Sequence, residues 1–422
     1  MKINPILHLN STVSVPGSKS YTQRALIIAA LSQGRSILSH VLISEDTHYL
    51  VGALRFLGIN ILTSDNDIIV QGTGGNIHNP GKTIFLGNNG TALRFLTTMV
   101  SLGKGEFILD GSRRLRERPL KPLLEALKVL GVTTHSRDDR GYPPVRIDAR
   151  GLRGGSVTFT DVESSQYISS LLIGAPYAEE DIEIRLKGST VSEPYIDMTL
   201  NVMERFGAEV EKGDQECFIV KSGCTYSGRR YTVEGDASSA SYFFLAAALC
   251  RGRVRVMNIN PESAQGDIRF LDIMANLGCS VMRGDTWVEV IGGPLHEGNF
   301  SFDMGNMPDM VPTLAVLAAF REGETVITNV SHLRIKESDR IAALVNELNK
   351  IGVVAQERSD GLVVVGGKPR GAEIDTYNDH RIAMSFAIAG LAVPGMSIKD
   401  RLCVRKSFPG FWDEVKKLYD HT

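Results

Sequence analysis

The sequence has few cysteines and no long hydrophobic run. Its 422 residues include five cysteines, none in a C-x-x-C pair, and such an odd, scattered set favours reduced thiols over disulfides or a zinc site. The longest apolar stretches, residues 242–250 and 313–320, are about half as long as a bilayer span requires. The N-terminus lacks the apolar core and the cleavage site of a secretory signal. We therefore expect a soluble, cytoplasmic protein with no membrane contact.

An excess of charge of one sign is also missing. The chain has 46 basic and 48 acidic residues and a net charge of −2, which disfavours a uniformly basic nucleic-acid-binding surface but not a local basic site. Hydrophobic residues make up 43% and charged residues 22%, so the chain is neither disordered nor fibrous. At roughly 100–200 residues per domain, the length allows two or three domains.

The sequence contains a sixfold internal repeat instead. A turn of small residues, an Ala- and Leu-rich helix and a glycine recur at intervals of 70 to 75 residues, beginning near Gly17, Gly87, Val162, Gly235, Gly305 and Asn378. A second marker, a helix that ends in a hydrophobic residue followed by glycine, recurs at Gly58, Gly131, Gly207, Gly278 and Gly352. The two markers stay in phase, which argues against the alternative of an ordinary α/β enzyme with chance similarities.

Each repeat is predicted to fold as strand, helix, strand, helix, strand, strand. In the second repeat, Pro119 stands where a helix can begin, and the leucines between 120 and 130 form one apolar stripe. The sixth repeat is expected to end in an amphipathic helix over 411–419 without the following strands. Six such units predict an α/β (α+β) fold with two pseudo-threefold domains of three βαβαββ units each.

Charged residues that interrupt the repeat mark a candidate site. A turn of small residues that opens a helix offers unpaired backbone N–H groups to an anion, and the helix dipole adds to the attraction. Residues 17–20 and 88–91 fit this pattern, and a simple helix cap is the alternative. Charged side chains occur at four of the six helix starts, at Lys19, Arg24, Asp236, Asp309 and 379–381.

Two further clusters are rich in charge. Residues 112–121 hold five cations and one acid, and a solvated surface, a nucleic-acid contact and a phosphate or carboxylate site all remain open there. If residues 333–341 are helical, Lys336 and Arg340 lie on one face, with Glu337 beside them; a salt-bridged exposed helix is the alternative. Because cations from several repeats accompany Asp309 and Glu337, we expect one polyanion pocket built from both halves of the chain.

The motifs taken together resemble one enzyme family, the 5-enolpyruvylshikimate-3-phosphate synthases, or 3-phosphoshikimate 1-carboxyvinyltransferases. The resemblance covers essentially the whole chain in order. It is carried by VPGSKS with Arg24 (15–24), LGN-x-GTA-x-R (86–94), RERP (116–119), SSQ (164–166), EGDASSASY (234–242), PD (308–309), KESDR (336–340), NDHR (378–381) and KSFPGF (406–411). The chain departs from many members at Asn89 and from some members at Phe95 and His332.

The resemblance implies a reaction, a fold and a domain division. The enolpyruvyl group of phosphoenolpyruvate is transferred to the 5-hydroxyl of shikimate 3-phosphate by addition and elimination through a tetrahedral intermediate, in the pathway to chorismate and the aromatic amino acids. No metal or organic cofactor is implied, and the partners are these two small molecules, with no nucleic acid and a monomeric enzyme. Residues 16–232 would form the first inside-out α/β barrel domain, which mainly binds shikimate 3-phosphate. Residues 1–15 with 233–422 would form the second, which mainly binds phosphoenolpyruvate and holds the catalytic acids, with the active site in the cleft between the two domains.

The resemblance also implies roles for single residues. Asp309 would take the hydroxyl proton, and Glu337 with Lys19 would handle the methylene proton. The implied shikimate 3-phosphate contacts are Lys19, Ser20, Arg24, Ser164, Ser165, Gln166, Ser192, Tyr195, Asp309 and Lys336. The implied phosphoenolpyruvate contacts are Lys19, Gly90, Arg118, Gln166, Arg340, Arg381 and Lys406, with Asn88, Thr91 and His380 in support.

Three other functions compete with this one. A sister enzyme transfers enolpyruvyl to a UDP-sugar, but it typically carries a reactive cysteine in the arginine-containing loop, and residues 112–122 hold none. An RNA-end phosphate cyclase would share the repeat, and the balanced charge and lack of interleaved aromatics argue against it. A non-enzymatic repeat scaffold would leave the convergence of cations and two acids unexplained.

Overall fold

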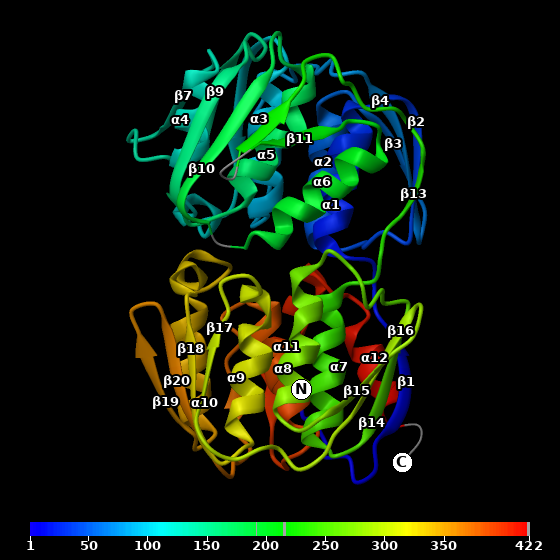
Figure 1. Cartoon of the computed structure of the whole chain (residues 1–422), viewed down its shortest axis with the longest axis vertical. Coiled ribbons are helices and arrows are strands. Elements are labelled where there is room, and N and C mark those ends of the chain that lie inside the picture. The colour runs from blue at the N-terminus through cyan, green and yellow to red at the C-terminus, as the bar shows by residue number, and fades with distance from the viewer. Residues whose placement is uncertain (191, 214–216, 420–422) are drawn as a thin grey trace. The chain divides into compact units, whose positions relative to one another are not determined.

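The chain folds into two compact units. The computed structural model describes residues 1–190, 192–213 and 217–419, with the backbone alone at 189 and 190. The first unit is Gly17–Val233, and the second unit is Met1–Pro16 together with Glu234–Thr422 (Figure 1). Each unit has its own hydrophobic core. The chain therefore starts in the second unit, builds the first and then returns.

The first unit contains three four-stranded sheets of identical topology. In each sheet the first two strands are parallel and the remaining pairs are antiparallel. The strand orders are β13-β2-β4-β3, β5-β6-β8-β7 and β9-β10-β12-β11. The strands are β2 (Gln33–Ser39), β3 (Asn60–Thr63), β4 (Asp67–Thr73), β5 (Ile84–Phe85), β6 (Gly105–Asp110), β7 (Thr133–Arg137), β8 (Tyr142–Ala149), β9 (Gly155–Val162), β10 (Ile182–Thr190), β11 (Val210–Gly213), β12 (Cys217–Val220) and β13 (Arg230–Thr232).

The second unit repeats this topology twice and truncates it once. Its sheets have the orders β1-β14-β16-β15, β17-β18-β20-β19 and β21-β22. The strands are β1 (Asn10–Ser14), β14 (Arg253–Met257), β15 (Ser280–Arg283), β16 (Trp287–Ile291), β17 (Phe300–Asp303), β18 (Gly323–Thr328), β19 (Val354–Arg358), β20 (Gly361–Gly366), β21 (Glu373–Ile374) and β22 (Ser397–Ile398). As expected, the sixth repeat ends in a helix, and no strand follows it within the described residues.

Two strands join the sheet of a repeat other than the one that they precede in the chain. Strand β1 precedes the first repeat in the chain but pairs with β14, whereas β13 precedes the fourth repeat but pairs with β2. These two sheets therefore receive their first strands from the segments at which the chain passes from one unit to the other. The strand–helix order predicted for the repeats is confirmed, and the mixed α/β fold class with it.

Each unit has inner helices that are buried on all sides. The first helix of every repeat lies inside its unit, and in the second unit α7, α9 and α11 pack against one another (Figure 1). An all-round apolar surface suits this position, because such a helix has no face for water. The inner helices are α1 (Lys19–Leu31), α3 (Gly90–Ser101), α5 (Gln166–Gly174), α7 (Ala237–Leu249), α9 (Val311–Ala319) and α11 (His380–Ala389).

The second helix of each repeat has a regular C-terminal end. After five of these helices a glycine adopts a positive φ, and its N–H and that of the next residue bond back to the last turn, the Schellman arrangement. These are the five glycines of the second sequence marker, so that marker is confirmed as a helix stop. The helices are α2 (Glu45–Phe56), α4 (Lys121–Val129), α6 (Pro194–Arg205), α8 (Phe270–Asn276), α10 (Arg340–Lys350) and, in the sixth repeat, α12 (Phe411–Lys417).

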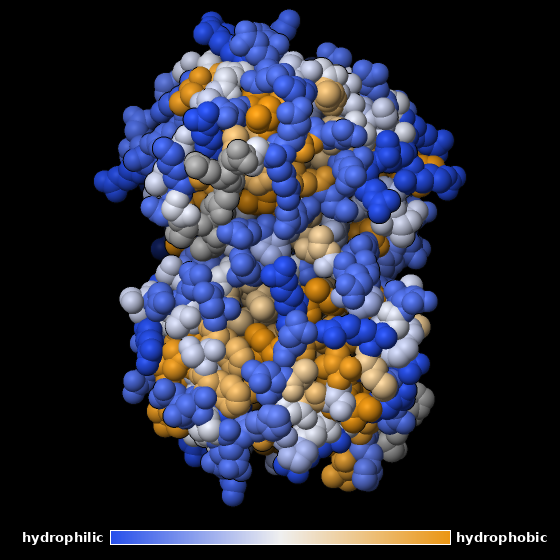
Figure 2. All heavy atoms as spheres, in the orientation of Figure 1, coloured by the Kyte–Doolittle hydropathy of each residue, from blue (hydrophilic) through white to orange (hydrophobic). Residues whose placement is uncertain are grey.

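The start of α4 differs from the expectation. The helix begins at Lys121 with Pro122 in its first turn, so Pro119 lies before it. The short 3₁₀ segments are η1 (Leu115–Glu117), η2 (Ala175–Tyr177), η3 (Gly266–Arg269), η4 (Pro308–Met310), η5 (Ser331–Ile335) and η6 (Arg401–Lys406). None of the helices in the described part of the chain is long and apolar enough to cross a membrane. Figure 2 shows hydrophilic side chains interspersed with hydrophobic ones on the face that it draws.

Candidate active site

The inner helices of the first unit bring their N-terminal ends together. Ser18 caps α1 by accepting from the Tyr21 N–H, and Asn89 caps α3 by accepting from the Ala92 N–H at 2.9 Å. The Gln166 Nε2 at the start of α5 donates to the Thr91 Oγ1 in α3 at 3.1 Å. Because every helix start carries partial positive charge, this end of the unit is suited to bind an anion.

Lys19 adds a full positive charge at the start of α1. Its Nζ lies 3.7 Å from the Asp46 Oδ2, and the Lys19 side chain is 14% exposed. Asp46 also ties α1 to α3, because its backbone oxygen accepts from the Asn89 Nδ2 at 2.8 Å. The ammonium group is thus held close to the helix starts while part of it remains accessible to a ligand.

Arg24 is a fully buried cation one turn further along α1. Its guanidinium donates to the Thr199 Oγ1 at 2.7 Å and to the backbone oxygens of Ser20 and Tyr195 at 3.1 and 3.0 Å. No carboxylate among the described residues lies within ion-pair distance of it. Burial lowers the pKa of Arg24 to about 10. A buried cation held only by neutral groups raises the affinity of its surroundings for an anion.

Arg118 packs directly against the start of α3. A Cβ at residue 90 would lie 2.4 Å from the Arg118 Cζ, so only glycine leaves room for the guanidinium there. Arg118 is 5% exposed, whereas the neighbouring Arg116 is exposed and forms a bidentate pair with Asp110. The basic cluster 112–121 is therefore divided between outward residues and one arginine at the helix-start end.

Arg94 orients the amide of Gln166. Its Nη1 donates to the Gln166 Oε1 at 2.9 Å and its Nη2 to the Pro119 oxygen at 3.1 Å. The guanidinium also lies over the Tyr167 ring, 5.3 Å from its centroid. Because the amide oxygen is held by Arg94, the amide nitrogen of Gln166 must face the start of α3.

The remaining predicted residues of the first unit flank the same helices. Ser164 and Ser165 precede α5 and are buried, and the Ser164 Oγ accepts from the Gln166 N–H at 3.3 Å. Ser192 is buried and adopts a positive φ of 62° just before α6. Its backbone oxygen accepts from the Tyr195 N–H at 3.1 Å, and the Tyr195 ring lies beside the Arg24 guanidinium, 5.8 Å away.

Arg340 is the centre of an ionic cluster in the second unit. Its guanidinium donates to Asp309 at 2.9 Å, to Glu337 at 2.8 Å and to Asp379 at 2.8 Å. Burial by itself would lower the pKa of Arg340, but the carboxylates, Asp379 foremost, outweigh it and the pKa is raised. Arg340 is 1% exposed, so it stays charged in the interior because three acids surround it.

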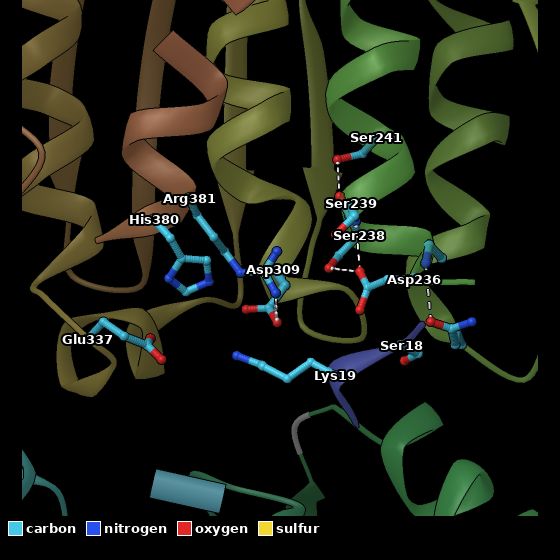
Figure 3. Close-up of polar contacts among 12 residues, drawn as sticks. Ser18, Lys19, Asp236, Ser238, Ser239, Ser241, Asp309, Glu337, His380 and Arg381 are labelled. Atoms are coloured by element: carbon cyan, nitrogen blue, oxygen red, sulfur yellow. Dashed lines mark hydrogen bonds and ion pairs between the residues drawn. The ribbon is translucent and has the colours of Figure 1, made fainter. Parts of the chain in front are cut away.

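Arg381 completes this cluster from the start of α11. Its Nη2 donates to the Asp309 Oδ2 at 2.6 Å, and its Nη1 lies 3.4 Å from the Tyr242 hydroxyl. In Figure 3 the Arg381 side chain extends from α11 to the Asp309 carboxylate. Asp309 therefore accepts from two guanidinium groups, one on each oxygen. Since each carboxylate oxygen has a further lone pair, it can also accept from a ligand.

The N-terminal ends of α7, α9 and α11 meet at this end of the second unit. Asp236 caps α7 and accepts from the Ser238 hydroxyl and the Ser239 N–H, as Figure 3 shows. Asp309 lies in η4, directly before α9, and Asp379 caps α11 by accepting from the Arg381 N–H at 3.0 Å. The second unit thus repeats the helix-start arrangement of the first, with acids added to the cations.

The helix expected over residues 333–341 is corrected by the structure, and two further predicted site residues are placed. Residues 333–341 do not form one helix, because Asp339 caps α10 and Arg340 is its first residue. Lys336 and Glu337 lie in the loop before it, so the predicted helical face was wrong, although Glu337 still reaches Arg340. Lys406 lies in η6 and is buried, and His380, the first residue of α11, is fully buried.

His332 is buried beside the ionic cluster as a neutral group. Neither ring nitrogen has a hydrogen-bond partner within the part of the chain that the structure describes. Burial, followed by the charge of Lys336, lowers the pKa of His332 to about 3. The unfolded chain takes up a proton at this imidazole near its ordinary pKa of about 6.5, whereas the folded chain does not. His332 therefore costs stability as the pH falls from about 6.5 towards 3.

We expect His332→Asn to reduce the loss of stability in acid. Between pH 7.5 and pH 5 the imidazole should cost about 1–2 kcal/mol, and the variant should recover most of this. Urea unfolding at both pH values measures it, and His296→Asn, at an exposed histidine of the same unit, is the control. An equal pH dependence in His332→Asn and wild type would contradict the burial argument.

Several residues that hold the site were missed by the sequence prediction. Arg94 and Asp379 lie inside quoted motifs but received no role, and Asp46, Ser169 and Thr199 were not singled out. Asp379 had a signal, since an acid directly before a predicted helix is a typical cap. The contacts of Arg24 with Thr199 and Ser169 had none, because they join residues about 145 to 175 positions apart.

Comparisons with known proteins agree on one family. The model of the family described as EPSP synthase (3-phosphoshikimate 1-carboxyvinyltransferase) matches residues 3–415. A curated 3-phosphoshikimate 1-carboxyvinyltransferase of Methanoculleus marisnigri is 44% identical over 96% of both chains. One of Escherichia coli is 40% identical over 99% of this chain and 98% of its own.

Solved structures give the same result. A structure of EPSP synthase from Acinetobacter baumannii superposes with a TM-score of 0.81 at 26% identity and covers 99% of this chain and 97% of its own. The family model and the relatives span almost the full length, both units and all the residues described above. The chain belongs to the EPSP synthase family.

Proposed function

We propose that this protein is a 3-phosphoshikimate 1-carboxyvinyltransferase. It transfers the enolpyruvyl group of phosphoenolpyruvate to the 5-hydroxyl of shikimate 3-phosphate and releases phosphate, a step in the biosynthesis of aromatic amino acids. The observation that carries this proposal is the cluster in which Arg340 and Arg381 converge on Asp309, with Glu337 beside them. Two fixed cations and two acids in one place suit an anionic substrate that must also exchange protons.

The distribution of cations matches the charge of the two substrates. Together they carry two phosphate and two carboxylate groups, and arginine binds such oxyanions in a planar, bidentate manner. In the first unit Lys19, Arg24 and Arg118 meet three helix starts, with Ser20, Ser164, Ser165, Gln166, Ser192 and Tyr195 as neutral partners for the shikimate ring and its phosphate. We propose that Lys336, Arg340, Arg381 and Lys406 provide the cations of the second unit, with His380 in support. In the first unit we propose Gly90 as a phosphoenolpyruvate contact, with Asn88 and Thr91 in support.

The reaction needs two proton transfers. The 5-hydroxyl oxygen attacks C2 of phosphoenolpyruvate and loses its proton to Asp309, while a proton from Glu337 or Lys19 adds to the C3 methylene. The resulting ketal has a methyl group and two oxygen substituents from the substrates. Elimination then breaks the C2–O bond to phosphate, a methyl proton returns to the group that donated it, and the double bond is restored. Asp309 passes the hydroxyl proton to the departing phosphate and is again a carboxylate. No covalent enzyme intermediate is required.

Arg340 and Arg381 can stay paired with the phosphate and carboxylate oxygens of the substrates throughout these steps. Arg340 and Arg381 are fixed by Asp309 and Asp379 before any ligand binds, so they need little reorganisation when charge moves during the reaction. A monomer in the cytoplasm without a nucleic-acid partner fits the five free cysteines and the balanced charge.

Phosphate release tests the proposed function. The purified protein is mixed with phosphoenolpyruvate and one of three acceptors, namely shikimate 3-phosphate, a UDP-sugar or an RNA end. We expect phosphate to be released only with shikimate 3-phosphate. Turnover with one of the other acceptors, and none with shikimate 3-phosphate, would overturn the proposal.

A further inference from the structure

The turn before α11 has an unusual backbone. Tyr377 and Asn378 adopt positive φ values of 54° and 53°, and the Asp379 N–H closes the turn by donating to the Thr376 oxygen at 2.8 Å. Both central residues are therefore left-handed, as in a type I′ turn, which favours glycine and asparagine. Asn378 suits this conformation, but a bulky residue such as Tyr377 is strained in it.

The second repeat has a corresponding turn with a different residue. There the Asn89 N–H donates to the Leu86 oxygen at 3.0 Å, and Asn89 caps α3 as Asp379 caps α11. The position that matches Tyr377 is Gly87, which has a φ of 57°. The fold thus accepts glycine at this point of the turn. A tyrosine in the sixth repeat needs a reason beyond the backbone.

The contact made by the Tyr377 hydroxyl explains why a tyrosine occupies this position. The Tyr377 hydroxyl donates to the Glu347 Oε1 at 2.8 Å, while the residue as a whole is 41% exposed. Packing alone therefore does not hold the ring. Partial burial, followed by the hydrogen bond to Glu347, raises the pKa of Tyr377, so the hydroxyl remains a donor. The hydrogen bond to Glu347 therefore anchors this side chain.

The Glu347 side chain is held in place by burial and by several hydrogen bonds. Its side chain is fully buried in α10, and it accepts from the Lys350 Nζ at 2.7 Å and from the Asp375 N–H at 3.0 Å. Lys350 in turn pairs with Asp375 at 2.8 Å. Four donated hydrogen bonds hold the carboxylate, so Glu347 binds the chain on both sides of Thr376.

The same helix also holds the cap of α11. Arg340 lies seven residues, or about two turns, before Glu347 and therefore on the same face of α10. Asp379 accepts from Arg340 through one oxygen and from the Arg381 N–H through the other. Helix α10 thus holds the segment 375–381 at two points, Glu347 before the strained turn and Arg340 after it.

We propose that Tyr377 and Glu347 are positioning residues for the phosphoenolpyruvate site. Their hydrogen bond fixes the strained turn, the turn places Asp379, and Asp379 holds the Arg340 guanidinium group and the backbone N–H of Arg381. The inference rests on the proposed function for the identity of the substrate. The effect of the hydrogen bond on the position of residues 379–381 does not depend on the substrate and can be tested without it.

Tyr377→Phe tests the kinetic consequence, because it removes only the hydroxyl. We expect the KM for phosphoenolpyruvate to rise about tenfold, since a hydrogen bond to a charged group is lost, whereas the KM for shikimate 3-phosphate changes less than about twofold. The control is Tyr419→Phe, which removes a hydroxyl that donates to the Asn4 oxygen in the same unit. An unchanged KM for phosphoenolpyruvate in an active Tyr377→Phe enzyme would overturn the inference.

Hydrogen exchange gives a readout that needs no activity. The amides of residues 379–381 should exchange faster in Tyr377→Phe than in wild type, and the rest of the second unit should not.

Tyr377→Gly, which also relieves the backbone strain, should raise the KM for phosphoenolpyruvate at least as much as Tyr377→Phe does. It should not unfold at a lower temperature than Tyr377→Phe. Unchanged exchange at 379–381 would overturn the positioning role, whereas an inactive wild-type enzyme would overturn the proposed function instead.

Discussion

Replacing Arg340 by methionine should destabilise the second unit by about 3–5 kcal/mol, the cost of leaving a buried charge without its partner. Methionine retains much of the side-chain volume, so the effect reports the lost charge and hydrogen bonds more than a cavity. Asp379 is fully buried, and Glu337 and Asp309 are 8% and 20% exposed in their side chains. Their carboxylates would face one another without the guanidinium between them.

Tryptophan fluorescence measures this loss in the correct unit. The chain has two tryptophans, Trp287 and Trp412, and both belong to the second unit, so urea unfolding followed by fluorescence reports that unit. Arg283→Met is the matched control, since Arg283 forms an exposed ion pair with Asp272, which should be worth no more than about 1 kcal/mol. Equal midpoints for the two variants would show that the cluster around Arg340 contributes nothing to stability.

Replacing Asp309 by asparagine should lower the rate of phosphate release by about 10²- to 10⁴-fold, the range found when a general base is lost. Asparagine has the same shape and can still accept from one guanidinium group, so the second unit should remain folded. Its neutral amide, however, takes no proton from the 5-hydroxyl. The expected loss is therefore in kcat, with binding of shikimate 3-phosphate changed less.

The control for this variant is an exposed acid of the same unit. Asp272→Asn removes a surface carboxylate and should leave the rate unchanged. Fluorescence unfolding of both variants separates a lost base from a lost fold. If folded Asp309→Asn retained a rate within a few-fold of wild type, Asp309 would have no role as the proton acceptor.

The fold could be predicted from the sequence largely because the repeats carry local signals. A glycine after a hydrophobic residue marks the end of a helix wherever the chain needs a left-handed residue, and all five such glycines, from Gly58 to Gly352, occupy this position. The start of α10 was predicted too early, because the charge spacing before it resembles that of a helix. The charge run 336–340 resembles a helix in spacing, but the Asp339 side chain accepts from the Ala342 N–H and begins the helix later.

The candidate site could be predicted only where a motif contained it. Arg340, Arg381 and Asp309 stood out because charged residues interrupt an apolar repeat. The groups that hold them are predicted less well, since Asp379 stands among the charged residues at the helix starts but is given no role, and nothing in the sequence marks Tyr377 or Glu347. Their roles depend on distances between α10 and the turn before α11 and on a backbone angle, which neither residue type nor spacing reveals.

Deuterium labelling tests the central claim most directly. The protein is incubated in D₂O with phosphoenolpyruvate and shikimate 3-phosphate, and the product is examined by proton NMR. Because a proton adds to the C3 methylene and a methyl proton is later removed, we predict an enol ether at the 5-oxygen with deuterium in its vinyl group. A product without deuterium would contradict addition and elimination through the ketal, and phosphate release without any enol ether would contradict enolpyruvyl transfer itself.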